Sequence, residues 1–367
     1  MDIRKLSRGV GITATLAAVL MAPTSSWAAV KAQPTAATIN IGYFANLTHA
    51  PALIAREQRL FEKYLGAGVT VKYTLFTVGT AEIEALKAGA IDVGYVGPAP
   101  AISGYLTTGG TGLNIVSGAT SGGAKFIVKP SLIATPGKPT PAEIAALTGK
   151  NIADPGLAGT QDVALKKYLN NNKLWANGAP TVNVVPLANA DTLTQFKLGN
   201  IDGAWVPEPW ATRLIQEGSG RVFVDEASLW PGGSFPTTEV IARQSFLKQY
   251  PGSVKAVLQA NLEAIAYLSK ASNQTNAIKQ VQSQLLKGTG KALADSVIQS
   301  AWPALKFSAD PVAPGIRQNF LAASKFNLLP SGSSYSQIKG ILNLSLVNQL
   351  RAASHKKPFT VPTSLKK

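Results

Sequence analysis

The chain has 367 residues, 46% of them hydrophobic, with 35 lysines and arginines against 19 acidic residues and a net charge of +16. It contains no cysteine, which excludes disulfides, thiolate nucleophiles and thiolate metal sites. The basic residues are scattered rather than gathered on one stripe. We therefore expect a solvated surface that attracts small anions and does not bind nucleic acid.

Residues 1–28 have the pattern of a cleavable signal peptide. A basic start precedes an apolar run from Gly9 to Met21, and small residues flank an expected cleavage point after Ala28. The apolar run is too short to cross a membrane, which takes about 20 residues. We expect export to the periplasm. Because a bacterial lipoprotein needs a cysteine at its new N-terminus, we also expect no lipid anchor.

Strands and helices alternate after a flexible leader over residues 29–37. The expected elements are a strand at 38–43, a helix from about Ala50, a strand at 69–76, a helix at 81–87 and a strand at 91–96. This order, at a spacing of about 30 residues, is typical of a mostly parallel α/β sheet.

The same order returns further along the chain. It predicts a strand at 150–153, a helix at 160–170, a strand at 182–186, a helix at 190–197 and a strand at 201–206. From about Arg243 the pattern becomes helical, over 252–269, 275–287, 292–301 and 335–352. We predict lobe I over 38–122 and 243–352, lobe II over 123–242, and a frayed basic, polar tail over 353–367.

The sequence carries no recognisable catalytic set. It has two histidines and no HExxH, Walker-type, GxSxG or strand-linked GxGxxG motif. Its few carboxylates show no spacing that singles out an acid–base pair. We therefore expect a binding protein, with no enzymatic activity, no metal and no cofactor.

Polar or glycine-rich loops repeatedly lead from a strand into a helix. A helix start presents free N–H groups and the positive end of the helix dipole, which suit a small anion. In an open α/β sheet such loops converge at the carboxyl ends of the strands. Each loop could equally serve only as an ordinary N-cap. The candidate residues in these loops are Asn46, Thr48, His49, Thr80, Gly97, Ser121 and Thr160.

The segment from Trp205 to Trp210 is rich in tryptophan and proline and suits a rigid wall of a cleft. Glu208 within it could accept a hydrogen bond from a ligand or pair with an amine on it. The alternative is that the tryptophans only pack between elements. Thr238 could reach the cleft from the returning segment. His49 could donate to an anion or serve in the core.

From about Ile39 to about Pro251 the chain resembles the aliphatic sulfonate, taurine and nitrate family of ABC-importer solute-binding proteins. The resemblance is carried by IGYFANLTHAPALIA, VGTAEIEALKAGAIDVGYVGPAPAISGY, GATSGGA, GTQDVALKKYL and IDGAWVPEPW, in this order. It implies the type II periplasmic-binding fold, with two α/β lobes, a hinge, two crossovers and a ligand cleft between the lobes. The ligand residues that it implies are Asn46, Thr48, Thr80, Gly97, Ser121, Thr160 and Trp205.

The sequence thus predicts a monomeric periplasmic solute-binding component of an ABC importer. It would capture a small organic anion by lobe closure and deliver it to the permease subunits in the membrane. An aliphatic sulfonate resembling taurine is the first candidate and nitrate the second. The alternatives are a cysteine-free enzyme or a pyrimidine-precursor binder on the same fold, and a surface-interaction protein suggested by the basic charge.

Overall fold

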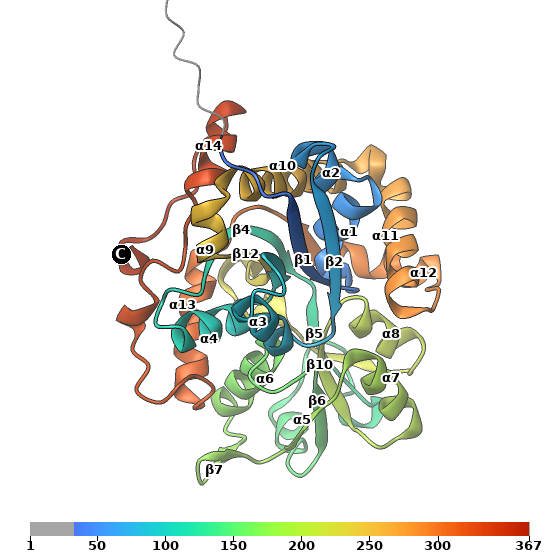
Figure 1. Ribbon diagram of the computed structural model, residues 1–367. Helices are drawn as coiled ribbons and strands as arrows, with labels where there is room; N and C mark the ends of the chain where they lie inside the picture. Colours follow the sequence, from blue (N-terminus) through green and yellow to red (C-terminus); the bar gives the residue numbers. More distant parts are fainter. Residues whose placement is uncertain (1–32, 367) are drawn as a thin grey trace, which may run out of the picture. The chain divides into compact units, whose positions relative to one another are not determined.

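The computed structural model describes residues 33–366 (Figure 1). The expected signal peptide and the first part of the leader lie outside the described residues. Within residues 33–366, no helix is both long and apolar enough to cross a membrane.

The larger of two main sheets has six strands in the order β13-β4-β12-β3-β1-β2. β1 pairs in parallel with β2 and β3, while β12 runs antiparallel to β3 and β4, and β13 antiparallel to β4. The strands are β1 (Thr38–Phe44), β2 (Thr70–Phe76), β3 (Val93–Val96), β4 (Leu113–Gly122), β12 (Pro236–Arg243) and β13 (Leu305–Phe307).

Helices pack around this sheet and form lobe I with it (Figure 1). One continuous apolar core joins strands β1, β3, β4 and β12 to helices α1, α10 and α11. The α-helices are α1 (Ala50–Glu57), α2 (Leu60–Leu65), α3 (Gly79–Lys87), α4 (Pro98–Thr107), α9 (Gln244–Gln249), α10 (Pro251–Leu268), α11 (Gln274–Thr289), α12 (Asp295–Ala301), α13 (Ala313–Lys325) and α14 (Ser345–Ala353).

The smaller sheet has the order β11-β5-β10-β6-β9 and forms lobe II with its helices. β6 is parallel to β9 and β10, and β5 is antiparallel to β10 and β11. Its elements are β5 (Ala124–Val128), α5 (Pro141–Ala145), β6 (Asn151–Asp154), α6 (Thr160–Asn171), β9 (Asn183–Pro186), α7 (Asn189–Leu198), β10 (Gly203–Pro207), α8 (Trp210–Gln216) and β11 (Arg221–Asp225).

Short elements complete the fold. A small hairpin in lobe II joins β7 (Trp175–Ala176) to β8 (Ala179–Pro180). The 3-10 helices are η1 (Leu47–His49), η2 (Pro130–Leu132), η3 (Glu226–Leu229), η4 (Pro231–Gly233), η5 (Ala271–Asn273), η6 (Trp302–Ala304), η7 (Tyr335–Ile338) and η8 (Thr363–Leu365).

The chain crosses between the lobes twice, which confirms the predicted two-lobed α/β fold. The first crossover is the step from β4 to β5 at Gly122 and Gly123, whose φ angles of 80° and 78° favour glycine. The second lies between β11 and β12. Because β12 pairs with β3 and β4, the chain is back in the larger sheet by Pro236, earlier than the sequence-based boundary at 242/243.

The C-terminal region differs from the sequence-based prediction. The helix expected over 335–352 is two elements, η7 and α14, separated around Gly340, which has φ of 86°. Helix α13 was not predicted. The tail is not frayed, because Leu365 is buried in the lobe I core and its carbonyl accepts a hydrogen bond from Gly340 N at 2.8 Å.

Candidate functional site

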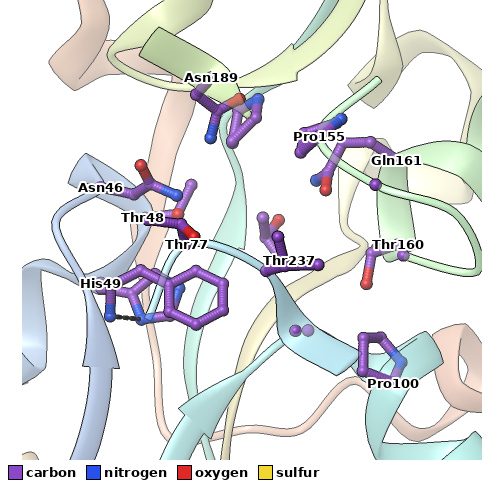
Figure 2. Close-up of a pocket in the computed structure, with 17 residues that line it drawn as sticks. Asn46, Thr48, His49, Thr77, Pro100, Pro155, Thr160, Gln161, Asn189 and Thr237 are labelled. Carbon is purple, nitrogen blue, oxygen red and sulfur yellow. Dashed lines mark hydrogen bonds between the residues drawn. The ribbon is translucent and has the colours of Figure 1, made fainter. Parts of the chain in front are cut away.

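A small cavity of about 50 Å³ lies between the two lobes, where loops from both sheets meet (Figure 2). Its described lining contains no lysine, arginine, aspartate or glutamate. The lining residues are Phe44, Asn46, Thr48, His49, Thr77, Val78, Gly79, Gly97, Pro100, Pro155, Gly156, Gly159, Thr160, Gln161, Asn189, Pro207 and Thr237.

Five helices begin at this cavity. Lobe I contributes the starts of α1, α3 and α4, and lobe II those of α6 and α7. In none of the five does the side chain of the N-cap residue itself cap the helix, although the Thr160 hydroxyl accepts Ala99 N in the first turn of α4. The helix dipoles, and the N–H groups that the first turns leave free, create positive potential in a cavity whose described lining carries no formal charge.

His49 is a neutral donor in the lobe I wall. Its side chain is buried and stacks on Phe44, with ring centroids 4.7 Å apart. Its Nδ1 accepts the Phe44 N–H at 3.3 Å, so the neutral ring carries its hydrogen on Nε2. Burial lowers the pKa of His49 to about 3. The imidazole therefore offers an N–H donor without a positive charge at neutral pH.

Thr160 and Gly97 bring the starts of α6 and α4 together across the cleft. The Thr160 hydroxyl accepts a hydrogen bond from Ala99 N at 3.4 Å, and it lies so near Gly97 that a Cβ there would collide with it. Glycine at position 97 thus permits the close approach of the lobes.

Asn46 and Asn189 face the cavity from opposite lobes (Figure 2). Asn46 Oδ1 accepts the indole N–H of Trp210 at 2.9 Å, a second contact between the lobes. Asn189 is 9% exposed, and its Oδ1 has no hydrogen-bond partner within the described protein. A buried amide oxygen without a partner is costly, so it marks a place for a ligand or water.

Two buried carboxylates shape the loop that lines the lobe II wall between β6 and α6. Asp154 Oδ1 accepts Gly156 N, and Asp162 Oδ2 accepts Ala158 N, each at 2.8 Å. Lys166 pairs with Asp162 at 2.8 Å. Burial, together with the neighbouring Asp162, raises the pKa of Asp154 to about 7. These groups hold the loop from behind without lining the cavity.

The structure brings five of the predicted residues to the cavity: Asn46, Thr48, His49, Gly97 and Thr160. Thr80 does not line it, because the wall is formed by the preceding Thr77, Val78 and Gly79 while Thr80 is exposed.

Ser121 and Thr238 also lie away from the cavity lining. Ser121 is buried against the second crossover, where its hydroxyl accepts Phe235 N at 3.1 Å. Register shifts on both sides of Thr238 in β12 leave Thr237 in the cavity wall instead.

Trp205 is a core residue of lobe II. Its ring stacks on Phe126 with centroids 5.5 Å apart, and its indole N–H donates to Glu226 Oε2 at 2.7 Å. Trp205 therefore lies in the lobe II core, while Pro207, the last residue of β10, lines the cavity.

Glu208 is fully buried and engaged within the protein. Its Oε1 pairs with Lys125 at 2.7 Å, and its Oε2 accepts Thr212 N at 3.0 Å. Its backbone also links to Gly123 and Leu47 beside the first crossover. The structure therefore gives Glu208 an internal ion pair next to the crossover and no place in the cavity lining.

Sequence reasoning did not single out the lining residues Thr77, Pro155 and Asn189. The lining residues Pro100, Gln161, Pro207 and Thr237 lie in segments that it did single out, but they were not among the predicted ligand residues. Asn189 could have been found by applying the helix-start rule to α7 as well. Among the described residues, no group of three or more His, Cys, Asp or Glu could hold a metal ion.

Comparison with known proteins places this chain in a family. The model of the NMT1-like family matches residues 32–282, more than half of the chain. The chain belongs to the NMT1-like family. The resemblance seen in the sequence is thereby confirmed.

A curated relative of this NMT1-like protein is the taurine-binding periplasmic protein of Escherichia coli (strain K12). It is 26% identical over 230 residues, which are 62% of this chain and 66% of that protein. The NMT1-like chain therefore spans just under two thirds of that relative's length.

Two solved structures share the fold. The nitrate-binding protein NrtA from Synechocystis PCC 6803 has a TM-score of 0.71 at 17% identity, covering 91% of this chain and 93% of that one. The alkanesulfonate-binding protein SsuA from Xanthomonas axonopodis pv. citri, bound to MOPS, has a TM-score of 0.65 at 20% identity, covering 81% and 96%. The structural similarity shows that this NMT1-like chain has the periplasmic-binding-protein fold. At identities this low, it shows the fold alone.

Proposed function

We propose that this chain is the solute-binding component of an ABC importer and that it captures a small anion by closing its two lobes. The observation that carries the proposal is the cavity between the lobes, where five helix starts and neutral donors meet and the described lining has no lysine, arginine, aspartate or glutamate. Such a lining favours an anion through dipoles and N–H groups.

An aliphatic sulfonate is the first candidate solute, and nitrate is the second. Both spread one negative charge over three oxygens, which suits several weak donors arriving from different helices. Relatives named for taurine, alkanesulfonate and nitrate binding support this range. The described lining offers no carboxylate to an ammonium group, so a plain alkanesulfonate should bind more tightly than taurine.

In this proposal the protein binds its solute and releases it chemically unchanged. His49 is the one titratable side chain in the described lining, and its pKa of about 3 makes it a poor general base near neutral pH. We further propose that the chain is exported to the periplasm after removal of residues 1–28, carries no lipid, acts as a monomer and delivers its solute to permease subunits in the membrane.

Closure of the lobes is the proposed mechanistic step. Thr160 of lobe II contacts Ala99 of lobe I, and Trp210 of lobe II contacts Asn46 of lobe I, so opening of the lobes at the cavity would break these contacts. A ligand that touches both walls binds the closed form better than the open form and shifts the population toward it. The closed form is then the one that the permease distinguishes.

Thermal unfolding of the purified protein against an anion panel tests this proposal. The panel contains alkanesulfonates, taurine, nitrate, bicarbonate and methylphosphonate. A ligand at about 100 times its Kd should add about 2.7 kcal/mol to the free energy of unfolding and raise the midpoint. If no anion raises it, the proposal is wrong.

A Thr160→Val variant locates the site. The lost hydroxyl should cost about 1.5–3 kcal/mol of binding energy, a tenfold to hundredfold increase in Kd, if it donates to the anion. Thr194→Val is the matched control, because Thr194 lies on the exposed face of α7. Equal affinities in wild type and Thr160→Val would remove Thr160 from the site.

A further inference from the structure

A pocket of about 130 Å³ lies in lobe II, between α6 and the second crossover, and shares no lining residue with the cavity between the lobes. A water molecule takes up about 30 Å³, so the pocket has room for about four waters or for one small organic molecule. Its lining includes Lys167, Tyr168, Glu226 and Trp230, and we call it the lobe II pocket.

Glu226 brings a buried carboxyl group to the lobe II pocket. It is 2% exposed, and its two oxygens accept the indole N–H groups of Trp205 at 2.7 Å and Trp230 at 3.3 Å. Both partners are neutral, so within residues 33–366 the carboxylate has no counter-charge in contact with it. Burial raises the pKa of Glu226 to about 7. A positively charged group of a ligand would favour the ionised form.

Lys167 brings an ammonium group of opposite charge to the same pocket. Its Nζ lies 4.7 Å from the centre of the Trp230 ring and donates to Gln318 of α13 at 3.3 Å. The side chain is half-buried, and burial lowers the pKa of Lys167. Lys167 and Glu226 form no ion pair with each other in the part of the chain that the structure describes. The pocket therefore holds two poorly solvated charges of opposite sign, each without a counter-ion.

Neutral donors accompany Lys167 on the same face of α6. Tyr168 is 6% exposed, and its ring packs against Phe126 and Phe223 in the lobe II core. Its hydroxyl has no hydrogen-bond partner within residues 33–366. Asn171 also lines the pocket, one helical turn after Lys167. These donors, together with the ammonium group, suit a carboxylate.

A ligand with a single charge does not suit the lobe II pocket, because an anion would face Glu226 and a cation would face Lys167. We propose that the pocket binds a small zwitterionic amino acid. Its ammonium group would contact Glu226, and its carboxylate would contact Lys167, with Tyr168 and Asn171 as further donors. Such a ligand gives each poorly solvated charge a partner of opposite sign. The proposal does not rest on the proposed anion capture, because the two sites share no residue.

Isothermal titration of the purified protein with glycine, L-alanine and L-serine tests the site. We expect saturable binding of at least one of them. Propionate and ethylamine are L-alanine without its ammonium group and without its carboxylate, respectively. Each should bind at least tenfold more weakly than L-alanine, because each leaves one charge of the pocket unpaired. No saturable binding of any amino acid, or equal binding of either single-charge compound, overturns the proposal.

Binding should also release protons at pH 7. A carboxyl group with a pKa of about 7 is about half protonated at this pH, and the ammonium group of the ligand would drive its ionisation. Titration with the amino acid that binds, in two buffers of different ionisation enthalpy, measures the release. Equal heats in the two buffers would mean that the ammonium group does not contact Glu226 and would overturn the proposed site.

Two variants locate the amino acid. Lys167→Met removes the ammonium group, and Glu226→Gln removes the carboxylate but keeps an acceptor for an indole N–H. Each should raise the Kd of the amino acid at least tenfold. Lys138→Met, at an exposed position of lobe II outside the pocket, is the control and should keep the wild-type affinity.

The variant Lys167→Met decides the test if Glu226→Gln does not fold. Wild-type affinity in Lys167→Met overturns the location in the lobe II pocket. Competition between the amino acid and an alkanesulfonate would place the amino acid in the cavity between the lobes, which also overturns the second site. Failure of the alkanesulfonates themselves to bind overturns only the anion proposal.

Discussion

Burial decides the chemistry of individual residues in the cleft. His49 is stacked on Phe44 and shielded from water, so it is neutral where an exposed histidine would be partly charged. Glu208 is also buried, but it forms an ion pair with Lys125 inside the protein. A titratable residue in this cleft therefore cannot be assigned a role from its type alone.

His49 should make the folded protein less stable in acid. The unfolded chain protonates this histidine below its ordinary pKa of 6.5, whereas the folded protein resists protonation down to a pKa of about 3. Stability is therefore lost as the pH falls between these values. From pH 6.5 to 4.5, the free energy of unfolding of the wild type should fall by about 2–3 kcal/mol more than that of His49→Asn.

Denaturant unfolding at both pH values measures this difference. Asparagine can still accept the Phe44 N–H, and the comparison cancels the other groups that titrate in this range, such as Asp154. Identical pH dependence in the two proteins would show that the fold leaves the pKa of His49 at its ordinary value.

The ion pair of Lys125 and Glu208 should be important for stability. Glu208 is 0% exposed and Lys125 only 14% exposed. Lys125→Met would leave a buried carboxylate without its partner and should lower the free energy of unfolding by about 3–5 kcal/mol. Lys129→Met is the control, since its pair with Asp202 is longer, at 3.7 Å, and about a quarter exposed. It should cost less than about 1 kcal/mol. Equal costs in denaturant unfolding would contradict this account of Glu208.

At the scale of elements, helix starts carry the site. The starts of α1, α3, α4, α6 and α7 converge because each follows a strand whose carboxyl end points to the cleft. This rule is local, and it predicted Asn46, Thr48, His49, Gly97 and Thr160 from sequence. It could not predict which way a strand residue faces.

The direction in which a strand residue faces explains why Trp205 and Thr238 do not line the cavity. Trp205 points into the lobe II core because of the register of β10, and Thr237 replaces Thr238 in the wall because β12 is bulged. Both depend on pairing between strands that are distant in sequence. The two-lobed fold was predictable, because the βα rhythm repeats along the chain. The return of the chain to lobe I at Pro236 was not predictable, because the composition of β12 fits a strand of either sheet.

Gly97→Ala should weaken ligand binding while sparing the fold. The φ angle of Gly97 is −68°, which alanine adopts easily, but its Cβ would collide with Thr160 across the cleft. We expect at least a tenfold increase in Kd and little change in the unfolding midpoint without ligand. The control is Gly68→Ala, where a Cβ would meet nothing within 4 Å. Wild-type affinity in Gly97→Ala would mean that binding does not need α4 and α6 to approach.

At the scale of the whole molecule, the proposed binding depends on both lobes. Each lobe has its own sheet and its own apolar core, and the cavity belongs to neither alone. Polar contacts between the lobes include Trp210 to Asn46, Gln216 to Ser300 and Lys167 to Gln318. In the proposed mechanism these contacts break when the lobes open, and the ligand supplies the remaining energy for closure.

Isothermal titration of the purified protein with alkanesulfonates and nitrate tests the central claim most directly. The account predicts saturable binding of at least one of these anions at one site per chain, with the heat signal returning to baseline after every injection. Sustained heat after each injection would indicate turnover and contradict a pure binding protein. The absence of saturable heat for every anion would contradict the anion site itself.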